Sequence, residues 1–203
     1  MQNKLVASCI AVAALAAFAA SAASASPVLT ENGVAIPAGA SVTAANTGVI
    51  KFTDREITEE CTTLLWTGTV LQNTGTKIQL EFPKGLGFGG TGTFAPCTSP
   101  KGEFSWSFKS KLCFEANKGS DNVVITGCGA NLLFTIGGEC EYSAASITGT
   151  FTTNSDATIT LANQSFERIK GLFIAGGIPC TTPASIDLVL DLTTTNGTTL
   201  SIS

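Results

Sequence analysis

The clearest chemical motif in the sequence is a glycine-rich stretch, PKGLGFGGTGTFAPC, at residues 83–97. In a dinucleotide-binding site, the spacing G-x-G-x-x-G follows a strand and opens a helix whose N-terminus binds the pyrophosphate. Here the residues TGTFAPC that follow the motif carry glycine and proline and cannot begin a helix. We therefore predict a loop between strands and no cofactor, and we take this loop as a candidate binding loop because a rigid β scaffold often presents ligand sites on its loops. The motif glycines are Gly85, Gly87 and Gly90, and the candidate binding residues are Gly85, Phe88 and Gly90.

Two pairs of carboxylates have spacings that bear on hydrolysis. Glu139 and Glu141 would share a strand face about 6.6 Å apart, which overlaps the carboxylate separation of an inverting glycosidase. Asp187 and Asp191 would also share a face, but about 13 Å apart, which is too far for such a pair. The favoured interpretation is that all four are solvent-facing charges that keep strands soluble. We predict no catalytic residue.

An acidic run between residues 54 and 60 could supply oxygen ligands to calcium, a hard cation that needs several of them. Its members are Asp54, Glu56, Glu59 and Glu60. The spacing of an EF-hand loop is missing, whereas Thr53 and Glu56 have the spacing of a helical capping box. The run therefore indicates a solvated helical turn over 53–60, and we predict no metal site.

The sequence contains no histidine. This excludes Ser-His-Asp and Cys-His nucleophile systems and leaves zinc only cysteine and carboxylate ligands. With 11 basic and 15 acidic residues the net charge is −4, and no basic patch is visible. Nucleic acid is therefore not an expected partner.

Six cysteines follow the N-terminal leader, an even number that indicates a disulfide framework in an exported protein. No C-x-x-C spacing supports a metal site. A hairpin between strands 103–114 and 122–128 would place Cys113 directly opposite Cys128, at the separation that a disulfide needs. We expect the other four to pair as Cys61–Cys97 and Cys140–Cys180, an assignment that spacing alone does not fix.

Apolar side chains recur at every second residue through most of the chain after residue 40, as in half-buried strands. The clearest examples are 76–82, 103–115 and 185–192. In these strands Trp106 would be buried, and alternation likewise places Trp66 in the core rather than on a sugar-stacking surface. Further strands are expected at 47–53, 61–72, 122–127, 130–136, 141–153 and 157–166, with a final hairpin turning at Asn196-Gly197. This pattern predicts an all-β fold, an antiparallel sandwich or barrel-like sheet with at most one short helical turn.

Residues 1–25 have the features of a signal peptide. Lys4 precedes an apolar run, and Ala23-Ser24-Ala25 is a small-residue cleavage site, so the exported chain would begin at Ser26. Cys9 lies in the part that is removed. No second apolar stretch reaches the roughly 20 residues of a membrane span, so we expect no integral membrane segment after processing. The remaining chain would have an extended N-terminal segment, 26–46, and one domain, 47–203.

Several phrases resemble known exported proteins. These are ECTTLLWTGTVLQNTGT, TGTFAPCTSP, VVITGCGANLLFTIGGECEYSAASITGTFTT and ATITLANQSFERI. They are similar to small, cysteine-paired β proteins of actinobacteria, which are largely uncharacterised, and more distantly to the PraB family. The resemblance covers about residues 47–203 and implies a role associated with alkane oxidation or biofilm matrix, without any catalytic residue. The chain differs by carrying Cys113 and a longer charged strand around it.

From these features we expect a secreted or cell-surface protein that is not an enzyme and that works in adhesion or binding, with its ligand unknown. The segment GLFIAGGIP, 171–179, is apolar without alternation, so it is either a buried strand or an exposed apolar loop. The first alternative function is a carbohydrate-binding module or a carboxylate-dependent glycoside hydrolase. A further alternative is a protease-inhibitor-like module with a rigid loop at 83–97.

Overall fold

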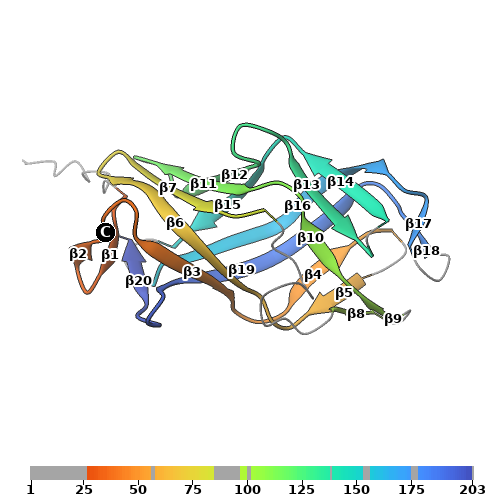
Figure 1. Ribbon diagram of the computed structural model, residues 1–203, viewed down its shortest axis with the longest axis horizontal. Coiled ribbons are helices and arrows are strands. Elements are labelled where there is room, and N and C mark those ends of the chain that lie inside the picture. Colours follow the sequence, from red (N-terminus) through yellow and green to blue (C-terminus); the bar gives the residue numbers. More distant parts are fainter. Residues whose placement is uncertain are drawn as a thin grey trace, which may run out of the picture.

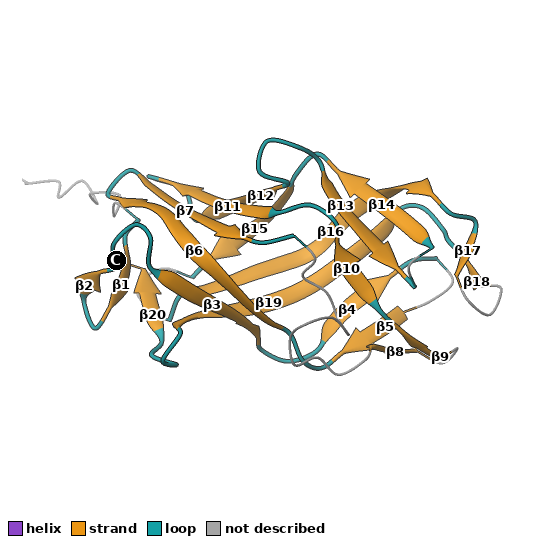
Figure 2. Cartoon of the chain, viewed as in Figure 1, coloured by secondary structure: helices purple, strands orange, loops and turns teal. Residues whose placement is uncertain are grey.

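Every regular element in the described part of the chain is a β-strand, which confirms the all-β prediction (Figure 2). The computed structural model describes residues 27–55, 58–84, 97–99, 102–137, 139–152, 156–174 and 178–202. None of these residues forms a helix long or apolar enough to cross a membrane. The glycine-rich loop with Gly85, Phe88 and Gly90 lies outside the described residues.

Eight antiparallel strands close into a barrel, which occupies the left half of the molecule in Figure 1. Closure comes from the pairing of β16 with β19, the two longest strands. In the order of hydrogen bonding the strands are β16 (Thr158–Lys170), β15 (Ile147–Phe151), β12 (Asn122–Thr126), β11 (Leu112–Asn117), β7 (Lys77–Phe82), β6 (Leu65–Thr74), β3 (Ser41–Asn46) and β19 (Ala184–Thr194). The segment 26–46 thus contributes β3 to the barrel.

The far ends of β16 and β19 carry the second half of the molecule. A bulge between Leu161 and Gln164 separates the two parts of the β16–β19 ladder, and Asn163 there has a left-handed φ of 49°. The backbone amide of Asn163 donates to the Asp187 carboxylate at 2.7 Å, which stabilises the bulge. Beyond the bulge, the strands hydrogen-bonded in turn outward from β16 are β14 (Cys140–Ala144), β13 (Leu132–Ile136) and β10 (Trp106–Phe108). Those outward from β19 are β4 (Ile50–Thr53), β5 (Thr58–Cys61), β8 (Cys97–Ser99) and β9 (Gly102–Phe104).

Two small sheets lie at opposite ends of the molecule (Figure 1). At the left end, β1 (Leu29–Glu31) pairs with β2 (Val34–Ala35) and with β20 (Leu200–Ile202). Asn73 of β6 fastens this sheet to the barrel. Its amide oxygen accepts from Leu29 N at 2.8 Å, and its nitrogen donates to Leu29 O at 2.7 Å and Ile36 O at 2.8 Å. At the right end, β17 (Phe173–Ile174) and β18 (Ile178–Pro179) form a short hairpin.

One aromatic core runs through both halves. Trp66 is 1 % exposed, as predicted, and its ring lies 5.6 Å from Phe108 and 6.2 Å from Phe82. Phe108 continues the row into the second half, where Phe134 stacks on Tyr142 at 5.1 Å. Edge-to-face and tilted ring contacts of this kind stabilise beyond area burial. The two halves are therefore one packing unit.

Two Thr-Gly-Thr phrases mark places where a strand passes under a neighbouring side chain. Gly68 lies on the core-facing side of β6. A Cβ built on it would meet the Phe82 ring at 2.5 Å and the Glu81 carbonyl at 2.6 Å. Gly149 in β15 has the same relation to Leu161 at 2.6 Å. Glycine is required because only its missing side chain leaves room for these groups.

The predicted strands 76–82 and 185–192 are confirmed with their buried faces, but 103–115 is not one strand. It divides into β9, β10 and β11, which pair with three different neighbours. The break at Lys109 and Ser110 is held by Leu133, whose carbonyl accepts from Lys109 N and whose amide donates to Ser110 Oγ. Phe108, Leu112 and Phe114 are buried as expected, whereas the side chain of Trp106 lies outside the described residues.

The predicted helical turn over 53–60 is wrong. Residues 58–61 form β5, which pairs with β4 from Thr53↔Thr58 to Ile50↔Cys61, while Glu56 lies outside the described residues. The alternation of exposed and buried side chains in β5 serves a hairpin better than a helix. The final turn lies at the predicted place, but only Gly197, with a φ of 82°, has the left-handed backbone that a type I′ turn needs at both central positions.

Candidate functional site

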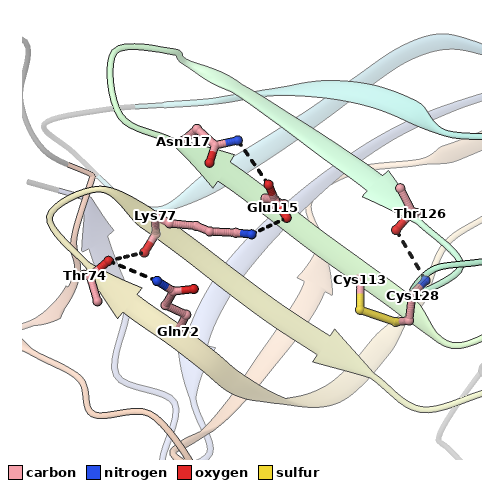
Figure 3. Close-up of polar contacts among 8 residues, drawn as sticks. All are labelled: Gln72, Thr74, Lys77, Cys113, Glu115, Asn117, Thr126 and Cys128. Atoms are coloured by element: carbon pink, nitrogen blue, oxygen red, sulfur yellow. Dashed lines mark hydrogen bonds and ion pairs between the residues drawn. A yellow bond between two sulfur atoms is a disulfide. The ribbon is translucent and has the colours of Figure 1, made fainter.

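Three disulfides hold the strands in the expected pairs. Cys61–Cys97 joins β5 to β8, with a Cα separation of 4.2 Å, and Cys140–Cys180 joins β14 to the residue after β18, at 5.8 Å. The third pair, Cys113–Cys128, has a Cα separation of 4.9 Å (Figure 3).

The predicted register around Cys113 is wrong by two residues. Cys113 lies opposite Thr126, and Cys128 lies beyond the end of β12 with a left-handed φ of 57°. A shift of two residues keeps the same face of the strand, so the two cysteines still meet. The disulfide consequently joins Cys113, the residue of β11 at the end of the β11–β12 ladder, to a residue beyond the end of β12.

Three of the four carboxylates in the predicted pairs have structural partners. Asp187 accepts the Asn163 amide, and Asp191 accepts the hydroxyls of Thr47 at 2.6 Å and Thr158 at 2.9 Å. Glu141 forms an ion pair with Lys170 at 3.6 Å, and Glu139 is exposed. These contacts give Asp187, Asp191 and Glu141 a structural role.

A polar groove of about 500 Å³ lies over β7, β11 and β12, around the Cys113–Cys128 disulfide. Figure 3 shows this disulfide with Glu115 and Thr126, which also line the groove. The ladder register builds it, because Glu81 lies opposite Cys113 and Gln79 opposite Glu115. Its lining offers carboxylate, amide and hydroxyl groups together with the disulfide and a valine. The lining residues are Gln79, Glu81, Cys113, Glu115, Val124, Thr126, Cys128 and Gly129.

Both carboxylates of this polar groove are paired with lysine. Lys77 Nζ lies 2.6 Å from Glu115, and Lys111 Nζ lies 2.6 Å from Glu81. The hydrogen bond from Lys77, aided by one from Asn117, lowers the pKa of Glu115 despite some burial. Glu115 is therefore ionised at neutral pH and unsuited to be the general acid of a glycosidase.

The polar groove also brings Glu81 within 4.8 Å of the sulfurs of Cys113 and Cys128. Those sulfurs are bonded to each other, and a metal needs thiolate ligands. With one carboxylate left, the cluster does not fit a metal. What the groove can do is hydrogen-bond a polar ligand through Gln79, Thr126 and the two carboxylates.

Two acids of the run at 54–60 are buried rather than solvated, contrary to the sequence prediction. Glu59 is 1 % exposed and Asp54 9 %. Burial, followed by the charge of Asp54, raises the pKa of Glu59 to about 7. Within the described residues, Glu59 Oε2 has no hydrogen-bond partner. In the sequence, only the alternation of Glu59 with Cys61 indicated that the Glu59 side chain points into the core.

Tyr142 lies near the same acids. Its pKa is raised by burial first and then by the charge of Asp54, with a smaller contribution from Glu59, while Arg168 acts in the opposite direction. Tyr142 is therefore neutral, and it serves the aromatic core that Phe52 and Phe134 also line.

A second candidate surface is the apolar end, defined by Ile169, Leu172 and Phe173, which belong to the end of β16 and the start of the β17–β18 hairpin. This hairpin lies at the right of Figure 1. These side chains are 57 %, 68 % and 55 % exposed. The described residues of 171–179 combine features of the two predicted structures: Leu172 and Phe173 are exposed, as in the loop, but Phe173–Ile174 and Ile178–Pro179 pair as strands. Residues 175–177 lie outside the description.

The apolar end is held firmly at its base. Cys140–Cys180 fixes the strand that returns from the hairpin, Cys180 N donates to Leu172 O at 2.9 Å, and Arg168 Nη1 donates to Cys180 O at 2.5 Å. Gly171, with a φ of 86°, makes the preceding turn, where a Cβ would overlap the Glu139 carbonyl. Large apolar side chains on so constrained a support are typical of a contact surface.

Comparison with protein-family models, curated proteins and solved structures finds no match to this chain.

Proposed function

We propose that the protein is an exported, non-enzymatic binding protein of the cell surface or extracellular matrix, and that it contacts its partner through the apolar end. The observation that carries this proposal is the exposure of Ile169, Leu172 and Phe173 on a hairpin fixed by Cys140–Cys180. Folding alone gives no reason to keep such side chains in water, since burying each would be favourable. Three disulfides are consistent with an extracellular location.

The test compares binding to envelope fractions of the producing cells. Leu172→Ser/Phe173→Ser should reduce the bound fraction at least tenfold, because two apolar contacts are lost. The matched control is Val34→Ser, which removes a side chain that is 70 % exposed at the opposite end. Equal binding of the two variants would refute a role for the apolar end.

Carbohydrate binding in the polar groove is the second candidate function. It is favoured by one observation, the convergence of Glu81, Glu115 and Gln79 on a groove of about 500 Å³. Carboxylate and amide groups accept hydrogen bonds from sugar hydroxyls, and the apolar part of the lining suits the C–H face of a ring.

A glycan array with the wild-type protein tests this second candidate. Glu115→Gln should weaken any glycan signal, while Glu60→Gln, at an exposed carboxylate in the other half, should leave it unchanged. A glycan signal unaffected by Glu115→Gln would place binding elsewhere. Release of free sugar from any glycan on the array would contradict the non-enzymatic proposal.

A further inference from the structure

We propose that the apolar end inserts into the interfacial region of a lipid bilayer whose head groups carry no net charge. This inference rests on the proposed function and names the class of partner. Its basis is the size, the shape and the charge of the surface formed by Ile169, Leu172 and Phe173.

The described side chains of the apolar end form a small surface. With 57 %, 68 % and 55 % of the three side chains exposed, it offers about 300 Å² of apolar surface. A stable protein interface buries about 800 Å² of polar and apolar surface on each partner, so these three side chains alone would not hold a second copy of this chain. A bilayer has no such requirement, because each apolar side chain partitions into it separately.

The shape of the apolar end also suits a bilayer. The β17–β18 hairpin lies at the extreme end of an elongated molecule, opposite the C-terminus (Figure 1). Its strands pair with each other at Phe173↔Pro179 and Ile174↔Ile178, and Leu172 O accepts from Cys180 N. Backbone groups that enter an apolar phase need such partners. The disulfide at Cys180 orders the support in advance, so insertion costs little conformational entropy.

The charges beside the apolar end provide no attraction to anionic lipid. Among the described residues at this end, the carboxylates of Glu139, Glu141 and Glu167 are matched by the cations Arg168, Lys170 and Arg55, whose amide donates to Thr181 beside Cys180. Lys170 is paired with Glu141 at 3.6 Å, and Arg168 donates to the Cys180 carbonyl. Attraction to anionic membranes requires a surplus of lysine and arginine. The apolar contact must therefore supply the affinity, and neutral head groups are preferred.

Vesicle flotation tests this inference with the chain from Ser26 onward, which contains every described residue, and with its three disulfides formed. The wild-type protein should float with phosphatidylcholine vesicles, equally well at low and high salt. Leu172→Ser/Phe173→Ser should lower the partition coefficient at least about thirtyfold, because each substitution removes a half-exposed apolar side chain from the contact. Val34→Ser should float like the wild type. Addition of phosphatidylserine should weaken flotation.

Four results would overturn the inference: no flotation of the wild-type protein, equal flotation of the double variant, loss of flotation at high salt, or a dimer in sedimentation that the double variant abolishes. Circular dichroism and the absence of free thiols establish that the variants are folded. If the wild-type protein fails to float while the double variant still loses envelope binding, the lipid inference fails and the proposed function stands. If envelope binding is also unaffected, both fail.

Discussion

Glu59 lies directly opposite Phe52 across the β4–β5 ladder, and both side chains point into the core. Phe52 contacts the rings of Phe134 at 5.5 Å and Tyr142 at 5.8 Å, so the Glu59 carboxyl occupies an aromatic environment. Asp54, two residues after Phe52, adds a negative charge nearby. The native fold therefore favours the protonated form of Glu59.

We predict that stability falls as pH rises from about 4.5 to about 7. The pKa of Glu59 is raised from 4.5 to about 7 on folding, so its contribution is complete below the unfolded value and is lost as pH passes the folded value. The free energy of unfolding should decrease by roughly 3 kcal/mol over this window. Urea unfolding at intervals between pH 4 and pH 8 measures it.

Glu59→Gln should remove most of that pH dependence, because the amide cannot ionise. The matched control is Glu60→Gln, whose carboxylate is exposed and paired with Lys51 at 3.4 Å. This control should keep the wild-type slope. An unchanged slope in Glu59→Gln would show that other groups cause the dependence.

The second prediction concerns Gly68. Gly68→Ala should lower the free energy of unfolding by about 2 kcal/mol, because the added methyl group would force the Phe82 ring and the β7 backbone to move. Thr67→Ala, on the exposed face of the same strand, should cost less than about 1 kcal/mol. Thermal unfolding of the two variants checks the ranking, and the reverse order would contradict the close approach of Phe82.

The third prediction concerns Asn73. Asn73→Ala removes three hydrogen bonds to Leu29 and Ile36, so we expect a loss of about 2 kcal/mol and faster hydrogen exchange at the Leu29 amide. Asn73→Asp retains the oxygen that accepts from Leu29 and should protect that amide better than Asn73→Ala. Gln72→Ala should leave exchange unchanged, since its amide contacts only Thr74 among the described residues. Equal exchange at the Leu29 amide in all three variants would exclude a role of Asn73 in holding the β1–β2–β20 sheet to the barrel.

The fourth prediction compares two disulfides. Removing Cys140–Cys180, which closes 40 residues, should cost about 4 kcal/mol, against about 3 kcal/mol for Cys113–Cys128, which closes 15. Paired Cys→Ser substitutions and urea unfolding measure both. Only the first pair of substitutions should also speed hydrogen exchange at the backbone amide of residue 180, which donates to Leu172 O. Faster exchange there in the second pair would show that the apolar end depends on the distant disulfide.

Alternation of apolar residues predicted β7 and β19 with the correct buried faces, because an unbroken period of two defines both a strand and its inner side. It failed at residues 103–115, since Phe108 and Leu112 keep the same parity across the break at Lys109 and Ser110. A pattern that preserves its phase cannot show that the strand has changed neighbours. The solvated position predicted for Glu59 was wrong because the prediction followed the charge of its side chain and not its alternation with Cys61.

The candidate surfaces were predictable to different degrees. The apolar end depends on five neighbouring residues, so the sequence could mark it as one of two alternatives for 171–179. The polar groove depends on the register of β7 against β11, which lie far apart along the chain. Nothing in either strand alone specifies that Gln79 and Glu115 lie side by side.

The passage of β16 and β19 through both halves has a mechanical consequence. Tension applied between the apolar end and the opposite end would run along these two antiparallel strands and load their shared hydrogen bonds together. A partner held at one end would therefore pull on a stiff rod rather than on two domains joined by a hinge.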